Sequence, residues 1–224
     1  MTTSLVTPSV QDGLLGTSLR QQIDSTIEEL IIALPDPKRL TAEQRRGMIA
    51  RYTAVLEGNF IYWMTATYLS VKAADARPIL LDNLREEVRD CHPAMLRNFT
   101  MAAQAFPTDK DALDVHNDLT NVRLFLGRLS GVQNLLTMAF FEGYIQQFMA
   151  YLAELAELQG SAERVYTDVH GVCDIEHSEG LFRALYAEMA INPLDPLADL
   201  FEGVDLLRTL LLRINRVDES KLAA

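Results

Sequence analysis

Two of the four histidines in this chain lie in the segment TDVHGVCDIEHSEGLF, residues 167–182, with an aspartate between them. His170, Asp174 and His177 are spaced four and then three residues apart. At about 100° per residue on an α-helix, these side chains fall within about 60° of one another, on one face. Imidazole and carboxylate groups are ligands for Fe, Mn and Zn, and the apolar flank VHGVCDI favours burial over a solvated polar face. The spacing therefore predicts a metal-binding helix.

Two further acids stand alone in long uncharged segments. Glu142 is the only Asp, Glu, Lys or Arg between positions 128 and 154, and Glu57 is the only one between positions 51 and 72. A buried carboxylate must take up a proton, pair with a cation or accept hydrogen bonds, because desolvating its charge is costly. Each acid is thus either a neutral or paired core residue or a metal ligand. Helical bundles hold two metal ions with carboxylates from some helices and carboxylate–histidine pairs from others.

A second histidine lies near acids in NLREEVRDCHPAML, residues 83–96. Glu87 and His92 are five residues apart, which is about 140° on a regular helix, so they share a site only if the helix widens locally. A π-bulge would do this and often marks a functional site. Glu86, six residues from His92, is no better placed and remains an alternative to Glu87. An exposed polar role for His92 also remains open.

The other histidine and both cysteines are expected to have no role in the site. His116, in ALDVHNDL, is interpreted as a surface residue. Cys91 and Cys173 each adjoin a candidate ligand in sequence, and such neighbours point about 100° apart on a helix. We therefore expect both cysteines to be packing residues.

Helical periodicity dominates the chain and predicts the elements that must position these side chains. Residues 19–34 place Ile23, Ile27, Leu30, Ile31 and Leu34 on one stripe. Thr41 and Gln44 form a predicted capping box. The expected helices cover about 19–34, 41–72, 78–105, 108–130, 131–160, 161–190 and 197–216. The sequence predicts an all-α, single-domain bundle of about seven helices over residues 17–218, with a mobile lead-in over 1–16 and a tail over 219–224.

Composition narrows the classes of function. Twenty basic and 31 acidic residues give a net charge of −11, which disfavours nucleic acid or an anionic membrane as a partner. Two cysteines are far too few for a secreted disulfide scaffold. The N-terminus lacks the basic start and apolar segment of a signal peptide, and no stretch of about 18 residues is apolar enough to span a membrane. We expect a cytoplasmic protein.

The segments NLREEVRDCHPAML, the isolated Glu142 and HGVCDIEH together resemble the haem-oxygenase-like diiron oxidases and oxygenases. The resemblance covers roughly residues 45–190, and is strongest to the branch of the chlamydial protein that associates with death domains and its cyanobacterial relatives. It implies a seven-helix haem-oxygenase-like bundle with two Fe ions, or Mn and Fe. It also implies a set of ligands, with Glu86 as the alternative to Glu87 and Glu57 as a possible extra carboxylate. The implied ligands are Glu87, His92, Glu142, His170, Asp174 and His177.

The resemblance further implies an enzyme that activates O2 at the dimetal site to oxidise a small organic substrate. The substrate classes are amino acids, amines and fatty acids, and the reactions are N-oxygenation, desaturation and oxidative C–C cleavage. Such an enzyme needs an electron donor, which the sequence does not identify. Two alternatives remain: a cysteine-dependent, thiaminase-like hydrolase, and a helical interaction protein with a structural metal or none. The apolar C-terminal segment LFEGVDLLRTLLLRI suggests a homodimer, unless it closes the bundle.

Overall fold

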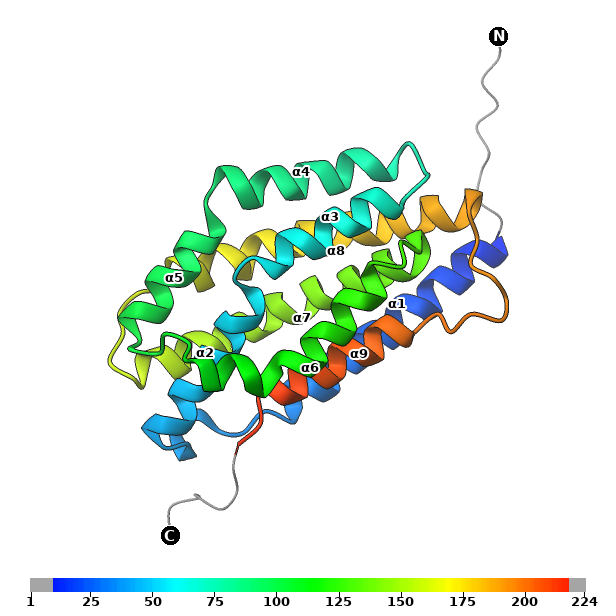
Figure 1. The fold of residues 1–224 in the computed structure, drawn as a ribbon. Coiled ribbons are helices and arrows are strands. Elements are labelled where there is room, and N and C mark those ends of the chain that lie inside the picture. The colour runs from blue at the N-terminus through cyan, green and yellow to red at the C-terminus, as the bar shows by residue number, and fades with distance from the viewer. Residues whose placement is uncertain (1–9, 218–224) are drawn as a thin grey trace.

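Two long antiparallel helices, α7 (Gly131–Glu157) and α8 (Val165–Ile191), form the centre of the structure (Figure 1). Each has 27 residues and is therefore about 40 Å long. α7 is buried on almost every side along its first three-quarters. This burial accounts for the scarcity of charge there, where Glu142 is the only Asp, Glu, Lys or Arg, because a charge on any face would lose its water.

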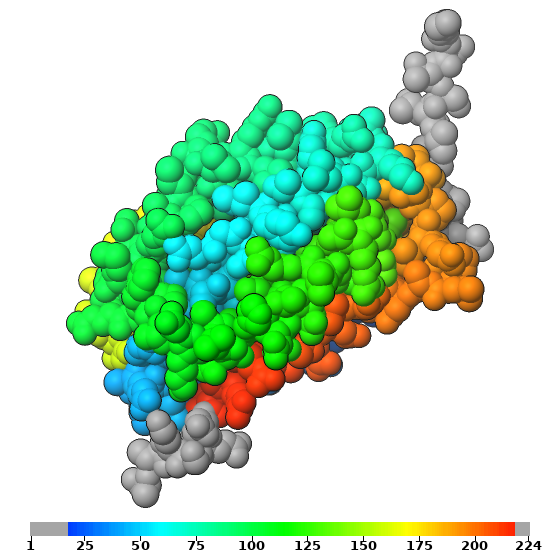
Figure 2. All heavy atoms as spheres, viewed as in Figure 1, coloured from blue at the N-terminus to red at the C-terminus, as the bar shows by residue number. Residues whose placement is uncertain are grey.

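The remaining helices surround this pair. The computed structural model describes residues 10–217, in which all regular secondary structure is helical, as the sequence predicted. α3 to α6 and α9 form most of the surface in one view (Figure 2). The other helical elements are α1 (Val10–Ile32), a short 3-10 helix (Pro37–Arg39), α2 (Ala42–Leu56), α3 (Asn59–Ser70), α4 (Ala76–Arg89), α5 (His92–Ala102), α6 (Asp109–Leu126) and α9 (Glu202–Ile214).

Side-chain caps define the starts of two helices. At the start of α2, the backbone N–H of Gln44 donates to Thr41 Oγ1 over 3.2 Å, and the backbone N–H of Thr41 donates to Gln44 Oε1 over 2.8 Å. This confirms the predicted capping box. α6 begins in the same way, with Thr108 as the cap and Asp111 as its partner. In both cases the side chains satisfy N–H groups that have no partner within the helix.

The single helix predicted over residues 41–72 is wrong, because the chain breaks between α2 and α3. Glu57 ends α2 with extended backbone, and Gly58 has a φ of +82°. Glycine adopts this left-handed conformation without the clash that a Cβ would cause. The break turns the chain beside the interior and brings Gly58 to the edge of a cavity.

The single helix predicted over residues 78–105 is also wrong. α4 ends at Arg89, Cys91 has φ +57° and ψ +40°, and α5 begins at His92. Pro93 suits the first turn of a helix but not its interior, because it lacks an N–H and clashes with the preceding turn. A helix break therefore stands where a π-bulge was considered. These two breaks are why the structure has more than the expected seven helices.

The outer helices confirm the predicted apolar stripes. In α1, Ile23, Ile27 and Leu30 are buried and Ile31 is partly buried against the core; Leu34, just after the end of this helix, is also partly buried there. In α9, Leu207 and Leu210 are buried in contact with α6 and α7, so that this helix closes the bundle. α1 begins at Val10, inside the segment predicted as a lead-in; residues 1–9 and the predicted tail 219–224 lie outside the described residues. Within residues 10–217, no helix is long and apolar enough to cross a membrane.

Candidate metal centre

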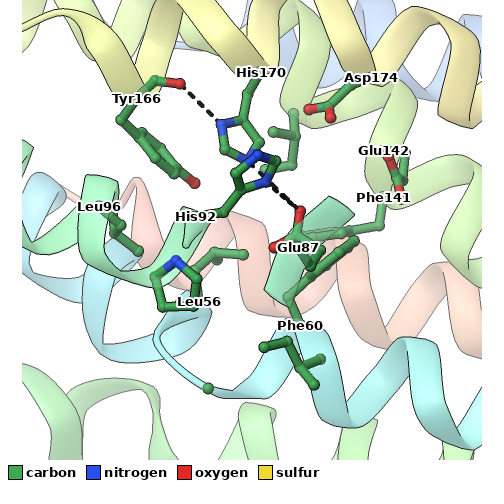
Figure 3. Close-up of a pocket in the computed structure, with 14 residues that line it drawn as sticks. Leu56, Phe60, Glu87, His92, Leu96, Phe141, Glu142, Tyr166, His170 and Asp174 are labelled. Carbon is green, nitrogen blue, oxygen red and sulfur yellow. Dashed lines mark hydrogen bonds and ion pairs between the residues drawn. The ribbon is translucent and has the colours of Figure 1, made fainter. Parts of the chain in front are cut away.

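Four helices bring the predicted ligands together in the interior (Figure 3). α4 supplies Glu86 and Glu87, α5 supplies His92 at its first residue, and α7 supplies Glu142. α8 supplies the three residues of the HxxxDxxH motif from one face, as the spacing predicted. Their side chains are 2–10% exposed, except that of Glu86 at 40%. They form two neighbouring clusters.

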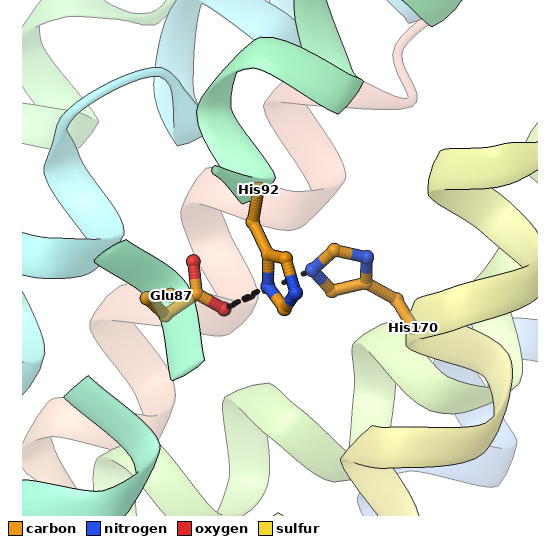
Figure 4. A group of neighbouring side chains, drawn as sticks. All are labelled: Glu87, His92 and His170. Carbon is orange, nitrogen blue, oxygen red and sulfur yellow. Dashed lines mark hydrogen bonds and ion pairs between the residues drawn. The ribbon is translucent and has the colours of Figure 1, made fainter. Parts of the chain in front are cut away.

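The first cluster comprises Glu87, His92 and His170, each of which offers one ligand atom within 4.8 Å of the others (Figure 4). His92 Nδ1 lies 2.7 Å from Glu87 Oε1, and His170 Nε2 lies 3.8 Å from the same oxygen. His170 Nδ1 donates to the Tyr166 carbonyl over 2.9 Å. That bond orients the ring so that Nε2 faces the cluster, as outer partners of metal-binding histidines commonly do.

The second cluster comprises Cys173, Asp174 and His177, again within 4.8 Å of one another. His177 Nδ1 lies 3.3 Å from Glu142 Oε2 and 3.6 Å from Asp174 Oδ1. His177 Nε2 bonds to Glu86 Oε2 at 2.8 Å. The structure thus joins Glu142 and Glu86 to this cluster through His177.

Electrostatics in the clusters follow from burial and close packing. Burial raises the pKa of Glu142 to about 7; His177 opposes this rise and the Asp174 carboxylate adds to it. Burial also acts to raise the pKa of Glu87, but the adjacent imidazoles of His170 and His92 outweigh it and lower this pKa to about 2. Burial acts to lower the pKa of His177, yet the Asp174 and Glu142 carboxylates that face its ring raise it to about 11.

No lysine or arginine among residues 10–217 pairs with Glu87, Glu142 or Asp174. Within the described chain, imidazoles are the only cationic partners of the three buried carboxylates. Two neutral donors also contact them: the Asn83 amide donates to Glu142 Oε1 over 2.7 Å, and the Cys173 thiol donates to Asp174 Oδ1 over 3.4 Å. Buried charges are usually paired or bind metals. A bound cation would balance these carboxylates when the imidazoles are neutral.

Glu57, the possible extra carboxylate, does not join either cluster. Its side chain forms an ion pair with Arg97 of α5. Its neighbours Leu56 and Gly58 line the cavity, whereas Glu57 itself does not. Pairing with a cation was one of the alternatives for an isolated acid, and the structure shows this pairing for Glu57.

The two cysteines differ from the expected packing role. Cys91 is exposed at the junction between α4 and α5, and Cys173 is half-buried in the second cluster. The prediction compared each cysteine only with the candidate ligand next to it in sequence. It missed that Cys173 lies four residues before His177, a spacing that places both side chains on the same face of the helix. Asn83 was also missed, although it lies one turn before Glu87. His116 is exposed, as predicted.

A small cavity adjoins the clusters (Figure 3). Its walls are largely apolar, and its free volume of about 30 Å³ is room for about two water molecules. Tyr166 lies at one side, with its ring 4.3 Å from that of His170 and its hydroxyl 2.7 Å from that of buried Tyr52. The apolar lining residues are Leu56, Phe60, Ile61, Leu96, Phe141 and Ile145.

The residues of both clusters fit a metal ion. Two ligand atoms about 2.1 Å from one ion lie at most about 4.2 Å apart, so groups within 4.8 Å need only small movements to share an ion. His177 Nδ1 is buried and has no hydrogen-bond partner, as expected of an atom whose partner is an ion. Carboxylate and imidazole donors suit Fe, Mn or Zn. The buried Glu/His cluster could therefore hold a metal ion.

Comparisons with protein-family models, with curated proteins and with solved structures found no match for this chain.

Proposed function

We propose that this protein is a non-haem dimetal oxidase or oxygenase of the haem-oxygenase-like type, which uses O2 to oxidise a small organic substrate. One observation carries the proposal: ligand-type side chains from four helices form two adjacent clusters whose buried acids pair with no lysine or arginine in the described residues. The resemblance of the sequence motifs to that family supports the same assignment. Two Fe ions, or Mn and Fe, are the proposed cofactors.

The contacts support a division of ligands between the two ions. Glu87, His92 and His170 would hold one ion. Asp174 and His177 Nδ1, with Glu142 beside them, would hold the other.

Glu86 fits an outer role better than a ligand role. It bonds to His177 Nε2, and a carboxylate on the second nitrogen of a metal-binding histidine fixes the ring and its tautomer. The geometry therefore favours Glu87 over Glu86 as the ligand from α4.

Bound iron, or manganese with iron, would supply the redox chemistry with O2. The residues of this chain would orient the ions and exclude water. Phe141 and Leu96 give the cavity an apolar wall beside the clusters, which strengthens electrostatic interactions there. Tyr166, hydrogen-bonded to Tyr52, orders the side nearest His170.

The substrate must enter through a movement of the chain. A free volume of about 30 Å³ does not hold an amino acid, an amine or a fatty acid, because each is much larger than two water molecules. The junction between α2 and α3 borders the cavity at Gly58, which is exposed. We infer that this junction moves when the substrate binds.

The cysteine-dependent hydrolase is less well supported. A nucleophilic cysteine needs a lowered pKa. Burial and the neighbouring Asp174 instead raise the pKa of the Cys173 thiol well above its usual range. The Cys91 thiol contacts only the carbonyls of Val88 and Arg89, so no base activates it.

The test is anaerobic loading with Fe(II), followed by exposure to O2 in a stopped-flow spectrophotometer. We expect about two Fe per chain and a transient visible absorbance that an amino acid, amine or fatty acid accelerates. His170→Ala and Glu142→Gln should reduce the iron bound, whereas Glu57→Gln, outside the clusters, should not. A structural-metal protein would bind the ions without any reaction with O2, and a metal-free protein would bind none.

A further inference from the structure

We propose that the Cys173 thiolate is a ligand of the metal ion held at the second cluster, beside Asp174 and His177. The proposal rests on the metal centre described above and adds a sulfur ligand to it.

The local geometry brings the thiol to the cluster. Cys173 Sγ lies 3.4 Å from Asp174 Oδ1, and a ring nitrogen of His177 completes a group whose three ligand atoms all lie within 4.8 Å of one another. Cys173 and His177 are one helical turn apart, four residues along α8. Side chains with this spacing differ by about 40° around the helix and are neighbours on its surface.

A second observation points to a ligand at the same place. The His177 side chain is only 10% exposed, and its Nδ1 is buried without a hydrogen-bond partner. This nitrogen faces Asp174 Oδ1 at 3.6 Å and Glu142 Oε2 at 3.3 Å. Buried nitrogens are normally satisfied. An ion among Sγ, Oδ1 and Nδ1 would satisfy His177 and offset the charges of the two acids.

Coordination needs no co-reactant other than the cation. The S–H bond of Cys173 breaks, a bond between sulfur and the metal forms, and the thiol proton leaves to solvent. Cys173 is half-buried, so the proton has a short route out. No change of oxidation state is involved.

The sulfur ligand makes the two metal positions chemically different. The first cluster offers only nitrogen and oxygen donors, from Glu87, His92 and His170. The second also offers a thiolate, which favours softer ions such as Zn(II) over Mn(II). We expect Cys173→Ser to weaken Zn(II) binding at that position by at least about tenfold, since loss of even an outer partner of a ligand typically costs 10- to 100-fold.

Cobalt(II) provides the direct test because a thiolate bound to it gives an intense charge-transfer band in the near ultraviolet. Metal-free, reduced protein is titrated with Co(II) under anaerobic conditions, and its absorbance is recorded together with the weaker visible bands that report any bound Co(II). The variants are Cys173→Ser and the matched control Cys91→Ser, which changes the exposed cysteine outside both clusters.

We expect the charge-transfer band in the wild type and in Cys91→Ser, and its loss in Cys173→Ser with the visible bands retained. Visible bands without a charge-transfer band in the wild type would overturn the sulfur ligand while leaving the metal centre intact. No Co(II) bands at all would overturn both. A band that survives in Cys173→Ser would also reject the proposal.

A measurement on the unmodified chain guards against a variant that does not fold. Iodoacetamide labels the two cysteines, and mass spectrometry follows each site with and without Zn(II). We expect Zn(II) to slow alkylation of Cys173 by at least about tenfold and to leave Cys91 unchanged. Equal rates at Cys173 with and without Zn(II) would contradict ligation.

Discussion

Many buried polar side chains in the described part of this bundle are satisfied by a hydrogen bond to another side chain or to the backbone. The hydroxyls of Tyr52 and Tyr166 are 2.7 Å apart with both rings buried, and burial is the main reason why the pKa of each is well above its usual range. Glu188, fully buried, accepts from the backbone N–H groups of Lys72 and Ala73. The second cluster differs because two buried carboxylates, those of Asp174 and Glu142, face one imidazole, and no lysine or arginine in the described residues pairs with them. This contrast separates the candidate site from ordinary core polarity.

The hydroxyls of Tyr52 and Tyr166 should contribute to stability as a coupled pair. Tyr166→Phe leaves the Tyr52 hydroxyl buried without a partner, which we expect to lower the free energy of unfolding by about 1–3 kcal/mol. The double variant Tyr52→Phe/Tyr166→Phe should lose less than the sum of the single variants. Urea denaturation of the wild type, the two single variants and the double variant measures these losses in a double-mutant cycle. Strictly additive losses would show that the hydroxyls are not coupled.

At the scale of helices, the two breaks decide what reaches the site. The break at Gly58 borders the cavity, and the break at Cys91 lets α5 begin with His92, which points back to Glu87. A continuous helix would hold residues 87 and 92 about 140° apart. A left-handed residue at Cys91 achieves what a π-bulge was expected to do.

Two glycine substitutions should have opposite effects on stability. Gly58→Ala places a Cβ at a φ of +82° with nothing within 4 Å, so we expect strain alone to cost about 1–2 kcal/mol. Gly171→Ala, inside α8, meets only Met149 Cβ at 3.9 Å and should stabilise the protein by about 0.5–1 kcal/mol. Thermal and urea unfolding of the metal-free variants measure both; a Gly58→Ala variant as stable as the wild type would contradict the strain argument.

The start of α6 should carry an acid-sensitive contribution to stability. Burial acts to raise the pKa of Asp111, but hydrogen bonds from Arg46 and Thr108 lower it to about 2. Because this folded-state pKa lies below the ordinary value of 3.8, the contribution is complete above about pH 4 and is lost as the pH falls towards 2.

Asp111→Asn removes that contribution. We expect it to lower the free energy of unfolding at pH 7 by about 1–2 kcal/mol, since it removes charge-assisted hydrogen bonds. The gap between variant and wild type should narrow as the pH falls from 4 to 2. Urea denaturation across this range measures the gap, and a gap independent of pH would mean that the Asp111 charge does not contribute.

At the scale of the whole molecule, the candidate site connects four helices that are otherwise held by apolar packing. α4 and α5 carry Glu87 and His92, and both helices pack on α8. α9, which suggested a homodimer, has its apolar face buried within the chain. The homodimer stays a prediction, as do the electron donor and the substrate class.

Metal binding should therefore stabilise the whole bundle. At a free metal concentration of about 100 times Kd the gain is about 2.7 kcal/mol, which raises Tm by about 5–10 °C for a chain of this size. Calorimetry of metal-free protein with and without Fe(II), under anaerobic conditions, measures it. Glu57→Gln should keep the shift and His170→Ala should lose most of it. An unchanged Tm in the wild type would refute the metal centre.

Patterns within one helix were enough to predict the fold class, the apolar faces of α1 and α9, the capping box at Thr41 and the shared face of His170, Asp174 and His177. They were enough because a helix has a fixed period, so spacing along the chain determines which side chains share a face. The isolated charge of Glu142 likewise marked a residue that the structure buries, because desolvation excludes unneeded charge from a core helix.

Contacts between helices did not follow from spacing. Glu57 and Glu142 look alike in sequence, yet Arg97 pairs with the first and His177 faces the second. The partner of each acid depends on which helices pack together and where the chain breaks, at Gly58 and Cys91. Helix packing and chain breaks depend on the combined packing of many side chains that are distant in sequence. The spacing of residues within one segment therefore does not predict them.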